Sequence, residues 1–129
     1  KRNRRIYMAF RFRNSGKKER VKTGRLDIPA QTRVSVDCGF VPVYIAVTVV
    51  LNSTVRSHHV YDSRISTTTV GKTGQDTNDT VGIPTNVSQL FTEDGKGFKV
   101  KNGYNYTGWY FYYEALGEFS EGDNGMKEE

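Results

Sequence analysis

The sequence predicts an all-β protein, an antiparallel β-sandwich or jelly roll of about eight strands. Apolar and polar residues alternate along most of the chain, and helical periodicity is nearly absent. Turn residues separate the alternating segments, without the spacing of β-α-β units. The 129 residues suit one domain. We divide the chain into residues 1–20, a basic N-terminal arm with the first strand, residues 21–116, the sandwich, and residues 117–129, an acidic tail that we expect to be disordered.

The first two predicted strands cover residues 6–13 and 21–28. Within the second, the apolar residues change phase, which predicts a β-bulge at Gly24. Pro29 ends this strand, because proline cannot donate to a sheet ladder. The apolar face of the first strand is formed by Ile6, Met8, Phe10 and Phe12.

The middle of the chain predicts four more strands. Residues 32–38 alternate, and Asn52-Ser53 is a turn signal. Residues 43–51 are rich in β-branched residues and apolar on both faces, which predicts a central strand covered on both sides. Strands are expected at 55–61 and at 64–70, and the second is rich in Thr, which favours a position at a sheet margin.

The following segment predicts a long exposed loop. Residues 71–80 contain almost nothing to bury and Pro84 follows, so we expect residues 71–86 to form a loop of the kind that often carries function. Residues 87–91 form either a short strand or a single helical turn, and residues 94–97 form a tight turn.

The last strands follow this turn. Residues 98–100 form a short strand, and Asn102-Gly103 is a strong hairpin signal. The final strand covers residues 107–116. Its two faces consist of Trp109, Phe111, Tyr113 and Ala115 on one side, and of Tyr110, Tyr112, Glu114 and Leu116 on the other.

The composition limits the class of protein. Hydrophobic residues make up only 36% of the chain, but eight Tyr, seven Phe and one Trp each bury a large area. The longest apolar run, Val41 to Leu51, is about half of the roughly 20 residues that a membrane-spanning helix needs. We therefore expect no membrane partner. The single cysteine, Cys38, excludes an intramolecular disulfide, so stability must come from packing or association.

The net charge of +5 conceals a strong asymmetry. Residues 1–25 carry 11 Lys and Arg against one acid, and residues 114–129 have a net charge of −5. The basic arm either stays solvated, docks onto an acidic protein surface such as the tail of a neighbouring copy, or neutralises the phosphates of a nucleic acid. Its partner-binding cations are Arg2, Arg4, Arg5, Arg11, Arg13, Lys17, Lys18 and Arg20.

We find no motif for catalysis, a metal or a cofactor. His58 and His59 are adjacent on a predicted strand, so they point to opposite faces and do not easily ligate one ion. Gly71-Lys72-Thr73 is similar to the end of a phosphate-binding loop. The first glycine of such a loop would have to stand at position 66, which is Ser66. Cys38 has no partnered His and is expected to be a buried, inert thiol. The sequence therefore predicts a protein that is not an enzyme.

A recognition surface is the main alternative to a purely structural role. The loop at 71–86 and the aromatic hairpin could bind a host glycan, although ordinary core and edge packing also explains the aromatic residues. The candidate residues are Lys72, Asp76, Asn78, Tyr104, Tyr106 and Trp109. Asn-x-Ser/Thr sequons fall in predicted loops at Asn52, Asn78, Asn86 and Asn105, but no secretory signal is visible, which favours ordinary polar loops.

Four short motifs resemble domains of tailed-bacteriophage virion proteins. The segment 39–47, Gly-Phe-Val-Pro-Val-Tyr-Ile-Ala-Val, is similar to a Gly-Phe-x-Pro-x-Tyr-Ile-x-Val strand start in such domains. Tyr-Asp-Ser follows at 61–63 and Gly-Phe-Lys-Val at 97–100, and the aromatic strand at 108–113 closes the domain. The resemblance covers roughly residues 21–116.

The resemblance implies a β-sandwich of a tail-fibre, baseplate, head-fibre or decoration protein, which is typically multimeric and located in the virion. It implies structural roles for Gly39 in a turn, for Pro42 at a strand start and for the aromatic residues in the core, and no catalytic residues. The arginine-rich start and the acidic end depart from the pattern. The expected function is a non-enzymatic virion structural protein whose partners are other virion proteins and its own copies. The alternatives are a host-glycan or receptor-binding module and a basic-armed coat protein that contacts nucleic acid.

Overall fold

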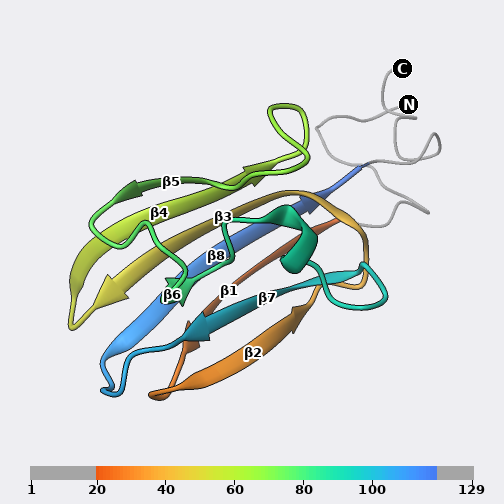
Figure 1. Ribbon diagram of the computed structural model, residues 1–129. Coiled ribbons are helices and arrows are strands. Elements are labelled where there is room, and N and C mark those ends of the chain that lie inside the picture. Colours follow the sequence, from red (N-terminus) through yellow and green to blue (C-terminus); the bar gives the residue numbers. More distant parts are fainter. Residues whose placement is uncertain (1–19, 119–129) are drawn as a thin grey trace, which may run out of the picture.

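The computed structural model describes residues 20–118, and these residues form the predicted antiparallel β-sandwich (Figure 1). A five-stranded sheet has the order β1-β8-β3-β4-β5, and a three-stranded sheet has the order β2-β7-β6. Every pairing is antiparallel. The elements are β1 (Val21–Asp27), β2 (Thr32–Asp37), β3 (Pro42–Leu51), β4 (Thr54–Asp62), β5 (Gly71–Gly74), β6 (Val81–Gly82), the 3-10 turn η1 (Val87–Gln89), β7 (Gly97–Asn102) and β8 (Trp109–Gly117). The strand predicted at 6–13 lies outside the described residues.

The hydrophobic core lies between the two sheets, as alternation predicts. Trp109 and Phe111 project inward from β8, and Phe98 projects inward from β7. On the same strand as Trp109, the alternate residues Tyr112 and Glu114 are exposed. The period-two pattern of β8 therefore assigned both of its faces correctly.

The β3–β4 hairpin closes through the predicted turn. Asn52 and Ser53 connect the strands with φ values of 49° and 73°. Two successive positive φ values match the twist of the flanking strands, which is why short hairpin loops favour them. The turn sets the pairing of Leu51 with Thr54 and of Val50 with Val55.

Gly24 is not a bulge. β1 pairs with β8 without interruption, and Gly24 lies opposite Tyr113. A Cβ atom at Gly24 would lie within 2.8 Å of the Cζ atom of Tyr113, so the glycine makes room for that ring. The apolar residues change phase because Val21, which is 48% exposed, lies on the outer face of the sheet rather than in the core.

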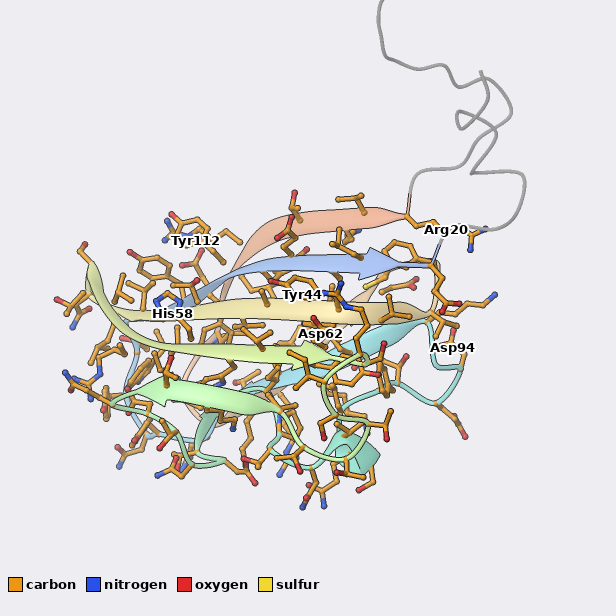
Figure 2. The ribbon with its side chains drawn as sticks, turned by 90° about the horizontal axis from the view of Figure 1, so that it is seen from above. Arg20, Tyr44, His58, Asp62, Asp94 and Tyr112 are labelled. Carbon is orange, nitrogen blue, oxygen red and sulfur yellow. The ribbon has the colours of Figure 1, made fainter. Side chains whose placement is uncertain are left out.

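β3 is central in its sheet, as predicted, but only one of its faces is covered by another layer of the described chain. Ile45 and Val47 point into the core and are at most 1% exposed. Tyr44 and Ala46 lie on the outer face and remain half-buried among their cross-strand neighbours. Figure 2 shows Tyr44 over this sheet, together with His58 and Tyr112. Residues 20–118 therefore do not supply the predicted second cover, and β-branched and aromatic side chains also suit a half-buried sheet surface.

The segment between β4 and β7 differs from the sequence prediction. Residues 64–70 form turns and a single bridge at Thr69 rather than a strand. The predicted loop 71–86 instead contains β5 and β6, and its residues Val81 and Ile83 are buried. Asp76 is also only 4% exposed, so this segment is part of the folded domain. Of the two alternatives for residues 87–91, the structure has the helical turn, at Val87–Gln89, followed by a single bridge at Phe91. The turn at 94–97 is confirmed.

Asn102-Gly103 does not form a hairpin, because β7 and β8 belong to different sheets. Asn102 is fully buried, and its side-chain amide donates to the carbonyl oxygens of Ile28, Pro29 and Tyr106 at 3.2–3.3 Å. Its Oδ1 accepts a hydrogen bond from the backbone N–H of Tyr104 at 3.0 Å. Asn102 therefore joins the connection between β1 and β2 to the connection between β7 and β8.

Candidate functional site

The basic arm joins the sandwich beside the start of the acidic tail. Of the predicted arm cations, Arg2 to Lys18 lie outside the described residues and Arg20 lies inside them. The carbonyl oxygen of Arg20 accepts a hydrogen bond from the N–H of Gly117 at 2.9 Å, next to the pairing of Val21 with Leu116. Glu118 follows directly, so the two charged segments join the domain at one end of the paired strands β1 and β8.

This end of the sandwich is hollowed. A cavity of about 640 Å³ lies between the start of β3, the turn before β7 and the residues Arg20 and Glu118. Figure 2 labels Arg20 and Asp94 at this end. Phe40 is half-buried there and Val41 is 56% exposed. The hollow therefore combines apolar side chains with Arg20, Lys96 and Glu118.

The predicted recognition residue Asp76 lies inside a polar cluster. Arg56 donates from Nε to Asp76 Oδ2 at 2.8 Å and from Nη2 to Oδ1 at 3.4 Å. The hydroxyl of Tyr104 also donates to Asp76 Oδ1, at 3.4 Å. The ion pair raises the pKa of Arg56, against a smaller lowering by burial. The cluster fastens the segment after β5 to β4, and Asp76 is not an exposed glycan contact.

Arg56 is absent from the predicted site because its position depends on a bulge. Val49 pairs with Ser57 and Val50 with Val55, which leaves Arg56 as the extra residue of β4. A bulge re-aims the side chain of the extra residue. Simple alternation cannot locate such a shift, although an arginine within an apolar strand is a signal worth testing.

The aromatic residues form a stack whose inner member belongs to the core. Tyr104 stacks on Trp109 with a centroid distance of 5.1 Å and an interplanar angle of 8°. Trp109 is only 2% exposed, whereas Tyr106 is 45% exposed. The hypothesis of a three-ring sugar platform is therefore wrong in its geometry, because Trp109 fills the space between the sheets. Packing, the alternative explanation, accounts for Trp109.

Lys72 and Asn78 brace their own segment. The side chain of Lys72 is 4% exposed, and its Nζ donates to the Asn78 carbonyl at 2.9 Å and to Asp79 Oδ1 at 3.1 Å. Burial lowers the pKa of Lys72, and the Asp79 carboxylate opposes this shift. Asn78 Oδ1 accepts from the N–H of Thr80 at 2.9 Å. Lys72 is therefore not the exposed contact that was predicted, whereas Asn78 remains exposed and, among the described residues, only the Oδ1 of its amide group is engaged.

His59, one of the two adjacent histidines noted in the sequence, makes contacts that the sequence did not predict. It is fully buried, while His58 is exposed, as expected for neighbours on a strand. The backbone N–H of Ile83 donates to His59 Nδ1 at 3.4 Å, so Nε2 carries the proton and donates to the Asp76 carbonyl at 2.8 Å. Burial lowers the pKa of His59 to about 4. The neutral ring links β4 to both ends of the 76–83 segment.

The described residues do not form a metal site, a phosphate-binding loop or a reactive cysteine site. Residues 20–118 contain no cluster of three or more His, Cys, Asp and Glu side chains that could hold a metal ion. Gly71-Lys72-Thr73 lies in β5, without the helix that a phosphate-binding loop requires. Cys38 is half-buried rather than buried, and burial raises the pKa of its thiol. No helix in the described part is long and apolar enough to cross a membrane.

The predicted site residues therefore separate into a charged end, where Arg20 lies, and a bracing network that holds Lys72, Asp76, Asn78, Tyr104, Tyr106 and Trp109. Comparisons with protein-family models, with curated proteins and with solved structures found no match to this chain.

Proposed function

We propose that this chain is a non-enzymatic structural protein of a bacteriophage virion, which assembles through contacts with its own copies and with other virion proteins. The observation that carries the proposal is the attachment of two oppositely charged segments to one end of a sandwich. The β1–β8 pair holds both attachment points together, as the hydrogen bond between Gly117 and Arg20 shows.

Charge complementarity favours exchange of these segments between copies. Residues 1–25 have a net charge of +10 and residues 114–129 a net charge of −5. An array of sandwiches brings the basic arm of one copy to the acidic tail of the next, beside the hollow that contains Phe40 and Val41. Many weak contacts of this kind add through avidity. A domain with few hydrophobic residues can therefore remain bound at high occupancy.

The assignment to a virion is supported by the sequence resemblance. Gly39 has a φ of 79°, and Pro42 begins β3, as the structural roles implied by the virion-domain motif require. The closing aromatic strand of that motif supplies Trp109 and Phe111 to the core.

The test is sedimentation equilibrium of the full chain at about 0.05 M and about 0.5 M NaCl, where screening differs strongly. We expect reversible oligomers at low salt that dissociate at high salt. The variant Lys17→Ser/Lys18→Ser, which removes two arm charges, should weaken association. The control Lys99→Ser/Lys101→Ser removes the same charge from the three-stranded sheet and should leave association unchanged.

Two results would overturn the proposal. A chain that stays monomeric at both salt concentrations has no such contact between copies. Equal weakening by both lysine variants would show that net charge, rather than the arm, drives association. Mass spectrometry of purified phage particles from the organism that encodes the chain tests the location, since we expect its peptides in the particles and not only in the surrounding lysate.

A further inference from the structure

A basic groove lies on the outer face of the three-stranded sheet. Its volume is about 450 Å³, which is within the range of small-ligand sites, ~300–1,000 Å³. The floor is formed by β2 and β7, with β6 and the segment before β7 along its side. The polar residues that line it are Arg33, Ser35, Asp79, Gln89, Lys99 and Lys101.

The cations of this groove lie close enough on neighbouring strands to repel one another. Arg33 lies directly opposite Lys101 in the antiparallel pair, and Lys99 lies opposite Ser35 one row further along the same face. Like charges directly opposite one another destabilise a sheet. None of these three cations forms an ion pair within residues 20–118. Within residues 20–118, no direct ion pair therefore relieves the repulsion between Arg33 and Lys101. The carboxylates of Asp37, Glu93 and Asp94 line the neighbouring hollow beyond Ser35.

The carboxylate in the groove does not supply a counter-charge to these cations. Asp79 Oδ1 accepts from Lys72 Nζ at 3.1 Å and from the N–H and hydroxyl of Thr85 at 2.9 and 2.7 Å. Buried Lys72 therefore neutralises Asp79, and the groove keeps the charge of its three cations. Asp79 Oδ2 has no hydrogen-bond partner among the described residues and remains an acceptor.

A ligand for this groove must be an anion that also carries hydroxyl groups. The cations suit carboxylates, and the free Asp79 oxygen, Ser35 and Gln89 suit hydroxyls. No aromatic side chain lines the groove, so a stacking platform for the bases of a nucleic acid is lacking there. We propose that the outer groove of the β2-β7-β6 sheet binds an acidic oligosaccharide through Arg33, Lys99 and Lys101. This site is independent of the assembly contact proposed above.

The test is a two-dimensional amide NMR titration of the full chain with a hyaluronan tetrasaccharide, which carries glucuronic acid carboxylates, at about 0.15 M NaCl to limit long-range attraction to the basic arm. We expect shifts at the amides of Ser35, Val100 and Gly82. The variant Lys99→Ser/Lys101→Ser should bind at least about tenfold more weakly, which corresponds to about 1.4 kcal/mol. The control Lys22→Ser/Lys96→Ser removes two exposed lysines outside the groove and should bind like the parent chain.

Two comparison ligands separate the alternatives. The carboxyl-reduced tetrasaccharide should not shift the groove amides, because it lacks the charge. A thymidine decanucleotide that shifts these amides at lower concentration than the tetrasaccharide would assign the groove to nucleic acid and overturn the proposal. Absence of groove shifts with the tetrasaccharide, or equal loss of binding in both lysine variants, would also overturn it. Thermal unfolding of each variant checks that the fold is retained.

Discussion

At His59, burial and two backbone contacts select the neutral imidazole. Its pKa is about 4, against 6.5 for the unperturbed side chain. The charged groups that act on it are Lys72, which lowers the pKa, and Asp76 and Asp79, which raise it. Desolvation is the largest contribution, so the protonated ring is disfavoured in the folded state.

The free energy of unfolding should therefore decrease as the pH is lowered from about 6.5 to about 4. In this window the unfolded chain takes up a proton that folded His59 does not, so stability is lost as the pH falls. The loss should reach about 3 kcal/mol, since each pKa unit corresponds to ~1.36 kcal/mol. Urea unfolding at a series of pH values measures it.

The two neighbouring histidines provide the control. His59→Gln should remove the slope in this window, and His58→Asn should keep it. The pKa values of Asp62, Asp79 and Asp94 are also lowered in the folded state. These carboxylates change the free energy of unfolding only below about pH 4, because their ordinary pKa is 3.8. A chain whose stability is flat from pH 7 to about 4.5 would contradict the account of His59.

Asn102 provides a second test at the scale of one residue. Asn102→Ala leaves the carbonyl oxygens of Ile28, Pro29 and Tyr106 without their buried donor. We expect a loss of about 3 kcal/mol in the free energy of unfolding, because unsatisfied buried polar groups each cost ~1–3 kcal/mol. Asn105→Ala, an exposed asparagine in the same connection, should change stability by less than about 0.5 kcal/mol. Similar losses in both variants would refute the bridging role of Asn102.

At the scale of the elements, the β2–β7 pair should gain stability when its repulsion is removed. Arg33→Thr replaces a cation opposite Lys101 with a β-branched residue on an exposed face. We expect an increase of about 0.5 kcal/mol, within the ~0.2–1 kcal/mol of cross-strand pairs. Arg33→Lys keeps the like charge and should bring no gain. Thermal unfolding compares the variants, and a decrease for Arg33→Thr would mean that Arg33 stabilises the sheet in some other way.

Strands with regular alternation or a long apolar run were predictable from the sequence, and strands with neither were not. β8 alternates over nine residues, so its existence and its inward face followed from period two. β3 was predictable from its run of β-branched and other apolar residues instead. β5 consists of Gly-Lys-Thr-Gly, which has no apolar residue, and it is a strand only because it pairs with β4. Tertiary pairing there overrides local propensity.

The candidate site was less predictable for a related reason. Lys72 and Asp76 belong to the same polar stretch, and a polar stretch suggests exposure. Their partners Arg56 and Asp79 are supplied by a bulge and by a chain reversal, neither of which leaves a periodic signal. Asp76 and Tyr104 were predicted to belong to one surface, and they do lie in contact, but the burial of Asp76 was not predicted.

At the scale of the whole molecule, the sandwich separates two charged regions. The end at Arg20 and Glu118 joins the arm and the tail, and the groove at Arg33, Lys99 and Lys101 lies on the outer face of the smaller sheet. An assembly that uses the end leaves that face accessible. The two proposals are therefore compatible in one particle and can fail separately.

A cryo-EM map of the purified phage particle would show directly which end of the sandwich makes the contacts between copies. We expect density for the sandwich to contact a neighbouring copy or virion protein at the end where Arg20 and Gly117 are joined. We also expect the β2-β7-β6 sheet to face the surrounding solution. A map in which that end projects into solvent while the smaller sheet is buried against the particle would contradict the account.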